Sequence, residues 1–185
     1  MKRSLLFTLF FALTGSALPA RDLFRVPSTG AGNRPGSYTI PGTGIPAFDR
    51  GAFYAAMESG NLARIDSELS VVATLTTKDR EAYEGALLMR KAGLLSRAKE
   101  KLATFRSGAM KLERCLARDS ANAEFHFLRL IIQEHAPKIL RYNKDRESDS
   151  RIVILAYPNL PPSLQKAVRD YCPHSRFIHE SDLNG

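Results

Sequence analysis

The sequence of 185 residues lacks tryptophan, has only two cysteines and contains no uninterrupted apolar run of bilayer length. A membrane-spanning helix needs roughly 18 consecutive apolar residues, so no such helix is expected. Two cysteines are too few for a small disulfide-stapled protein. Hydrophobic residues make up 44% and charged residues 25% of the chain, which excludes a mostly disordered protein. The length is that of one domain.

The first 20 residues have the pattern of a secretory signal peptide. Lys2 and Arg3 precede an apolar segment at 5–13, and small residues follow that segment. A basic start, a short apolar segment and small residues at the cleavage position define such a peptide. We therefore expect cleavage after Ala17 or Ala20 and export to the periplasm or the extracellular space. No cysteine lies near either position, so we expect a soluble mature chain without a lipid anchor or membrane span.

The charge balance is basic, with 27 Lys and Arg against 19 Asp and Glu and a formal net charge of +8. Loss of Lys2 and Arg3 with the signal peptide leaves 25 basic residues (27 minus 2) against 19 acidic ones, a net charge of +6. Export argues against nucleic acid as a partner. It favours another exported or envelope protein, or an anionic envelope polymer or lipid headgroup.

Residues 21–46 are predicted to form a flexible linker, because five glycines and four prolines lie between 26 and 46. Glycine costs backbone entropy to order and proline lacks an amide hydrogen, so neither favours a helix or a strand here. The predicted organisation is therefore a signal peptide at 1–20, this linker at 21–46 and a helical domain at 47–185.

After Pro46 the apolar residues recur at the spacing of amphipathic helices. Short loops between such helices require antiparallel neighbours, so we predict an all-α fold, an irregular antiparallel bundle of about seven helices in hairpins. The helices are expected at Asp49 to about Ser59, Leu62–Val72, Thr76 or Thr77 to about Lys91, Ser96–Leu116, Ser120–Pro137, 149–157 and Pro161–Cys172.

Three details refine this prediction. Gly85 in the third helix allows a neighbouring backbone to come close. The fifth helix is apolar over more than half of its circumference, which predicts a central position, and Pro137 must end or kink it. The segments 151–157 and 175–179 also admit two strands. We prefer helices there, because an isolated two-stranded sheet would leave its edges uncovered.

Paired helices with the runs Tyr83-x-Gly85-Ala86-Leu87 and 117–124 resemble tetratricopeptide units. The typical tryptophan is absent and the fourth helix is too long for such a unit, so a regular repeat is not expected. The stretches AYEGALLMRKAG, AEFHFLRLIIQEHAPKILRYNKD and LPPSLQKAVRDYC resemble a group of exported bacterial helical proteins with no assigned activity. This resemblance implies an all-helical, exported protein and supplies no catalytic residues.

Catalytic and metal-binding patterns are absent from the sequence. No HExxH motif or Gly-x-Ser-x-Gly turn occurs. His126 and His135 lie about 13 Å apart along one helix, which is too far to share a metal directly. We therefore predict no catalytic residue, metal or cofactor.

The most site-like cluster surrounds Pro137. It contains Arg129, Gln133, Lys138, Arg141, Tyr142, Asn143 and Lys144, of which Arg129, Gln133, Arg141, Tyr142 and Asn143 are the candidate ligand-binding residues. Cations, amides and an aromatic ring suit an anionic or sugar ligand, because arginine donates paired hydrogen bonds. The alternative is that Arg129 and Gln133 bind helix ends and Tyr142 packs the turn.

The two cysteines leave a second choice open. Cys115 and Cys172 either form a disulfide in an oxidising compartment or remain separate buried thiols. Sequence spacing does not decide between these two states.

These features predict an exported, non-enzymatic interaction or scaffold domain that binds an envelope protein or component. One alternative is an envelope enzyme or enzyme accessory with a polar site near His126, Arg129 and His135. Another is a basic module that binds anionic envelope polymers. That alternative rests on a basic fourth helix with Lys99, Lys101, Arg106, Lys111, Arg114 and Arg118.

Overall fold

The computed structural model describes residues 48–184. These residues form seven α-helices and four short 3₁₀ helices, and no strand occurs among them. The α-helices are α1 (Arg50–Glu58), α2 (Leu62–Ala73), α3 (Arg80–Leu94), α4 (Ala98–Arg118), α5 (Ala123–His135), α6 (Arg146–Ala156) and α7 (Pro162–Tyr171). The 3₁₀ helices lie at Lys138–Leu140, Tyr157–Asn159, Cys172–His174 and Glu180–Leu183. The all-α prediction is confirmed, whereas the predicted signal peptide and linker lie outside the described residues.

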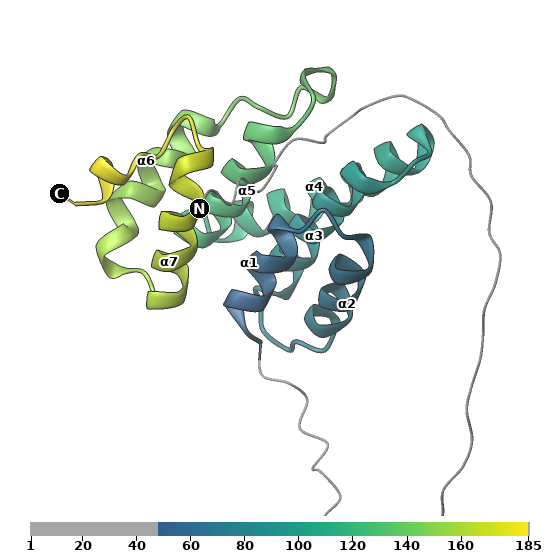
Figure 1. Ribbon diagram of the computed structural model, residues 1–185, viewed down its shortest axis with the longest axis horizontal. Helices are drawn as coiled ribbons and strands as arrows, with labels where there is room; N and C mark the ends of the chain where they lie inside the picture. Colours follow the sequence, from purple (N-terminus) through teal and green to yellow (C-terminus); the bar gives the residue numbers. More distant parts are fainter. Residues whose placement is uncertain (1–47, 185) are drawn as a thin grey trace, which may run out of the picture.

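From α1 to α6, helices that follow one another in the chain pack against each other (Figure 1). α3 and α4 make the most extensive contact, α5 pairs with α6, and α2 packs on α3. α5 also contacts α3 and α4, and α7 returns to α1. The tip of the α3–α4 hairpin and the loop between α5 and α6 project from the body. No helix in the described part of the chain is both long and apolar enough to cross a bilayer.

The first two helices begin as the sequence predicts. The Asp49 carboxylate accepts a hydrogen bond from the Gly51 amide, and the Asn61 side chain accepts one from the Arg64 amide. Such side-chain caps satisfy amides that have no partner inside the helix.

The next three helices start later than predicted. α3 begins after Asp79, rather than at Thr76 or Thr77, and α4 begins after Arg97. α5 begins after Asn122, because the Asn122 side chain accepts from the amides of Glu124 and Phe125. The predicted start at Ser120 is wrong because the Ser120 carbonyl instead accepts from the imidazole of His126.

The described segment 146–184 contains helices and no strand, which confirms the helical alternative over the two-strand one. α6 covers most of the segment 149–157 and continues directly into the 3₁₀ turn at Tyr157–Asn159. It begins three residues before Asp149, which therefore sits in its first turn. Residues 175–179 form no strand.

Two facing glycines bring α3 and α4 together. A Cβ atom on Gly85 would lie 2.7 Å from the Gly108 carbonyl oxygen, and one on Gly108 would lie 2.5 Å from the Gly85 carbonyl oxygen. Real Cβ atoms do not approach that closely, so only glycine fits at either position. The close approach predicted at Gly85 is confirmed.

α5 occupies the centre, as its composition predicts. Ten of its thirteen residues are buried. It ends at His135, and Pro137 follows in an extended conformation. Three buried residues of α5 are polar, namely Glu124, His126 and Gln133. A buried polar side chain is costly unless it is hydrogen-bonded, so each of them requires a partner from another element.

Candidate functional site

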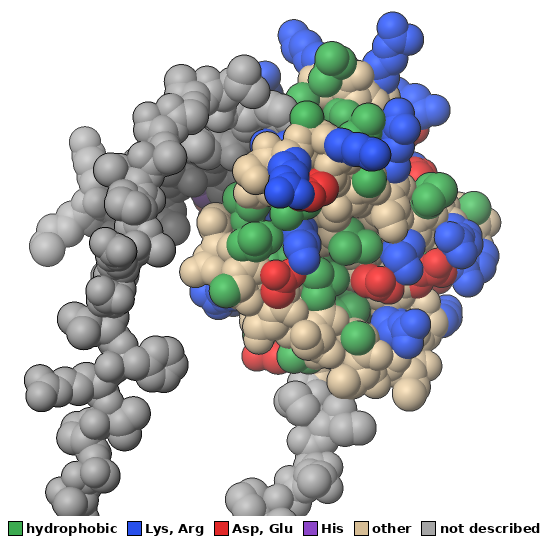
Figure 2. Space-filling view, turned by 90° about the vertical axis from the view of Figure 1, so that its right-hand side faces the viewer, with side chains coloured by type: hydrophobic (Ala, Val, Ile, Leu, Met, Phe, Trp, Pro, Cys, Tyr) green, Lys and Arg blue, Asp and Glu red, His purple; other side chains and the backbone are tan. Residues whose placement is uncertain are grey.

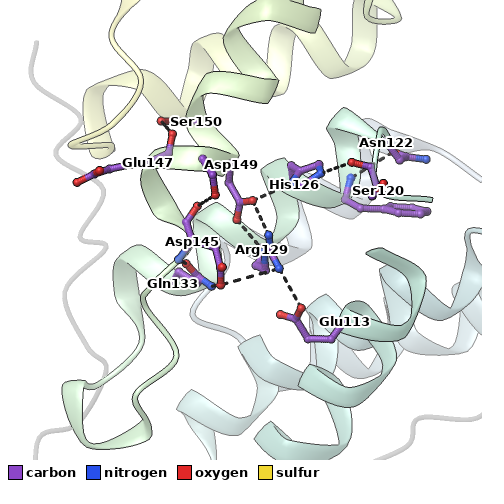
Figure 3. Close-up of polar contacts among 12 residues, drawn as sticks. Glu113, Ser120, Asn122, His126, Arg129, Gln133, Asp145, Glu147, Asp149 and Ser150 are labelled. Atoms are coloured by element: carbon purple, nitrogen blue, oxygen red, sulfur yellow. Dashed lines mark hydrogen bonds and ion pairs between the residues drawn. The ribbon is translucent and has the colours of Figure 1, made fainter. Parts of the chain in front are cut away.

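Asp149 is the centre of a buried polar network between α5 and α6 (Figure 3). Its side chain is fully buried. Its Oδ1 accepts from Arg129 Nη2 at 2.7 Å, and its Oδ2 accepts from Arg129 Nε at 2.8 Å. The Nδ1 atom of His126 lies 2.6 Å from Oδ1 of the same carboxylate. One carboxylate therefore joins two cationic side chains of α5 to the first turn of α6.

His126 is an imidazolium ion in this arrangement. Its Nδ1 faces the Asp149 carboxylate, and its Nε2 lies 2.9 Å from the Ser120 carbonyl oxygen. Both neighbours can only accept hydrogen bonds, so both ring nitrogens must donate. Burial alone would lower the pKa of His126, but the hydrogen bonds to Asp149 and Ser120 outweigh burial and raise it above 6.5.

The same contacts keep Asp149 ionised. Burial alone would raise the pKa of its carboxyl group. The hydrogen bonds from Arg129 and His126 are stronger in effect and hold the pKa below the usual 3.8.

Arg129 extends the network to a third helix. Its Nη1 donates to Glu113 Oε2 of α4 at 2.9 Å. The Tyr142 hydroxyl donates to Glu113 Oε1 at 2.6 Å, and the Tyr142 ring meets Phe105 edge-on at 5.5 Å between centroids. Arg129 thus links α4, α5 and α6, while Tyr142 fixes the loop to α4.

Gln133 fixes the entry to α6 by two reciprocal hydrogen bonds. Its Nε2 donates to Asp145 Oδ2, and its Oε1 accepts from the Asp145 amide, both at 3.1 Å. The Gln133 side chain is buried, so these bonds satisfy both ends of its carboxamide.

Four of the five predicted ligand-binding residues line one pocket of about 320 Å³. They are Arg129, Gln133, Arg141 and Tyr142, and the wall is completed by Glu113, Lys144 and Asp145. Asn143 does not line it. The hydrogen bonds of Arg129, Gln133 and Tyr142 are directed to other side chains and to the backbone of the protein itself.

Three carboxylates of this site are not predicted as site residues by the sequence: Glu113, Asp145 and Asp149. A sequence signal for two of them exists, because Asp145 and Asp149 are four residues apart and therefore share one side of a helix start. The partly buried guanidinium of Arg129 beside the buried His126 also requires nearby anions.

His135 lies in a different cluster from His126. Its Nδ1 donates to the Ile131 carbonyl at 2.9 Å, and the Tyr171 hydroxyl lies 3.4 Å from the same nitrogen. Burial lowers the pKa of His135. The neighbouring Glu134 accepts from the hydroxyls of Tyr171 and Ser175, which ties the chain end to α5. The structure therefore brings His126 and Arg129 together on one carboxylate and places His135 apart from it.

Both cysteines are buried and free in the structure. The Cys172 thiol donates to the Val168 carbonyl at 3.3 Å, and Cys115 Sγ lies 4.0 Å from Glu81 Oε2. Burial raises the pKa of both thiols, which disfavours the reactive thiolate. Their pairing in an oxidising compartment stays a prediction.

Between residues 48 and 184, no group of three or more His, Cys, Asp or Glu side chains is arranged to hold a metal ion. The chain matches no family model, no curated protein and no solved structure. The likeness to tetratricopeptide units is therefore not confirmed, and the contacts of the domain itself are the basis for a functional proposal.

Proposed function

We propose that the protein is an exported, non-enzymatic interaction domain that binds a helical segment of another exported or envelope protein. The binding surface is the outer face of α4, defined as Lys99, Leu102, Ala103, Arg106 and Met110. The observation that carries the proposal is that all five residues are exposed although three are apolar. Met110 is 62% exposed and Leu102 is 37% exposed.

The five residues lie on one side of the helix. Their spacing of three, one, three and four residues keeps them within one face. Gly108 and Leu112 of the same helix are buried and lie against Gly85 of α3. α4 is therefore packed on one side only along much of its length, and an apolar stripe on its other side is suited to a partner.

The composition of this face favours an acidic amphipathic helix as the partner. Leu102, Ala103 and Met110 offer apolar contact, and methionine adapts its shape to an irregular surface. Lys99 and Arg106 are cations on the same face, and the acid in line with them, Glu113, is paired with Arg129 of α5. Opposite charges set the orientation and speed of association, whereas the apolar contacts supply most of the affinity.

The buried hydrogen-bond network supports a structural role, and not a catalytic one, for His126, Arg129 and Asp149. General acid–base catalysis requires a group that can reach a substrate proton. Asp149 is instead hydrogen-bonded to both His126 and Arg129. His126 also donates to the Ser120 carbonyl, so its ring is fully engaged within the protein. The alternative of an envelope enzyme near His126, Arg129 and His135 stays a prediction.

The proposal is tested by affinity capture from solubilised envelope fractions. The variant Met110→Asp places an anion on the outer face of α4 and should weaken capture of the partner by roughly tenfold or more. Leu155→Asp is the matched control, because Leu155 is 74% exposed on α6. Equal capture by both variants, or turnover of a small substrate without any captured partner, would overturn the proposal.

A further inference from the structure

The loop between α5 and α6 is basic and carries an exposed aliphatic side chain. This basic loop, 137–144, contains Lys138, Arg141 and Lys144 and no acidic residue. Ile139 lies among these cations and is 88% exposed, so the domain covers almost none of it. The three cationic side chains have no ion-pair or hydrogen-bond partner in the part of the chain that the structure describes.

Side-chain contacts with α4 and α5 fix the C-terminal part of the basic loop. Tyr142 is fixed by its hydrogen bond to Glu113 and by the ring of Phe105, and the Gln133–Asp145 bonds hold the end of the loop. The exposed side chains of the loop therefore project from a backbone that is already fixed, which lowers the conformational entropy lost on binding.

The loop stands out from the body of the domain. Figure 1 shows it projecting beyond the helices at the top of the view. At the same level, Figure 2 shows hydrophobic side chains with Lys and Arg side chains projecting around them. The backbone of this loop therefore projects in Figure 1, and Figure 2 shows apolar and cationic side chains together at that level.

We propose that the basic loop binds the surface of an anionic phospholipid bilayer, with Ile139 inserted at the boundary between headgroups and acyl chains. Lys138, Arg141 and Lys144 then lie at the level of the phosphates. This inference goes beyond the proposed function, because it uses a surface other than the outer face of α4. It shares with that proposal the expectation of export.

The shape of the loop favours a bilayer over a protein groove. A stable protein interface buries about 800 Å² on each partner, which a single projecting loop does not offer. On a bilayer, one inserted apolar side chain and several cations near the phosphates act together and give reversible binding. Each cation near an anionic membrane contributes about a fivefold gain in binding, and a diffuse anionic surface requires no fixed pairing geometry.

The absence of tryptophan provides a direct test. Ile139→Trp gives the chain one tryptophan. Vesicles of phosphatidylcholine with phosphatidylglycerol should shift its emission to the blue, and lipids brominated on the acyl chains should quench it. Leu155→Trp is the control at another exposed site, on α6, and should show neither effect. Vesicles of pure phosphatidylcholine should give a much weaker response, because the cations then lack an anionic partner.

Sedimentation of the full chain with the same vesicles separates the apolar contribution of Ile139 from the electrostatic contribution of Arg141. Ile139→Asp and Arg141→Gly should each weaken binding, by roughly tenfold for the first and about fivefold for the second. Glycine keeps the left-handed backbone of Arg141, at φ 51°, so loss of binding there reports the charge. Unchanged emission of Ile139→Trp, or binding that is equal for all variants, would overturn the proposal. Capture of a protein that is lost with Ile139→Asp while vesicles have no effect would overturn it as well.

Discussion

Nδ1 of His126 lies 2.6 Å from Oδ1 of Asp149, and this contact joins two helices in the interior of the domain. The same carboxylate also accepts two hydrogen bonds from Arg129. A buried charge is tolerated only when it is paired and hydrogen-bonded, so each of the three groups depends on the other two. Stability should therefore be more sensitive to the carboxylate than to either cation alone.

Asp149→Asn keeps the shape of the side chain and removes its charge. It leaves the Arg129 guanidinium and the His126 imidazolium without their shared anion, and we expect a loss of about 3–5 kcal/mol in the free energy of unfolding. Urea denaturation followed by circular dichroism measures this loss.

Asp170→Asn is the control for that substitution. Asp170 pairs with Lys166 on the exposed side of α7, where an ion pair contributes at most about 1 kcal/mol. Similar losses for the two variants would contradict a special role for the buried carboxylate.

The raised pKa of His126 predicts a fall in stability with increasing pH. The folded protein holds this proton more tightly than the unfolded chain, in which the pKa is about 6.5. The stabilisation is complete below about pH 6.5 and is lost as the pH rises through the folded value, with a slope of at most about 1.4 kcal/mol per pH unit. The pKa of His135 is lowered, so this residue reduces the free energy of unfolding as the pH falls below about 6.5.

Urea denaturation from pH 5.5 to 8 measures this dependence below the range in which the two cysteine thiols titrate. The variant His126→Gln cannot titrate, so the fall above pH 6.5 should be present in the wild type and absent from the variant. Parallel curves for the two proteins would show that another group causes the change.

Gly108→Ala should destabilise the α3–α4 hairpin, because its methyl group would lie 2.5 Å from the carbonyl oxygen of Gly85. The two helices must move apart to remove this overlap, at a cost of about 1–3 kcal/mol. This cost outweighs the general preference for alanine over glycine in the interior of a helix. Gly60→Ala is the matched control, since no atom lies within 4 Å of its added methyl group. Thermal unfolding measures both, and a stable Gly108→Ala variant would contradict the close contact.

Arg141→Gly should leave the free energy of unfolding within about 1 kcal/mol of the wild type. Arginine in the left-handed region costs roughly 1–2 kcal/mol, and the greater freedom of glycine in the unfolded chain offsets part of that gain. Urea denaturation checks this expectation. A large loss would show that the arginine side chain has a structural role, and would remove this variant as a probe of charge in lipid binding.

The sequence predicts the helices well because their apolar spacing is regular. It places α1 and α2 to within a residue or two, since Asp49 and Asn61 stand directly before them. It misplaces the start of α5 because Ser120 and Asn122 are both good capping residues. In the structure the Asn122 side chain caps the helix, and the Ser120 carbonyl accepts from His126 instead.

The sequence predicts the polar site less completely. It groups Arg129, Gln133 and Tyr142 in one cluster, yet the partners Glu113 and Asp149 lie 16 and 20 residues from Arg129 in the chain. Contacts at that separation depend on how three helices pack, which periodicity does not specify.

Photo-crosslinking in living cells tests the binding role of α4 most directly. A photoreactive amino acid replaces Ala103 on the outer face of α4, and a separate control protein carries the same amino acid at Ser163, which is exposed on α7. We expect a discrete crosslinked protein from position 103 that is absent from position 163 and is lost when Met110→Asp is added. No crosslinked protein at position 103, or the same product from both positions, would contradict the proposed role of this helix.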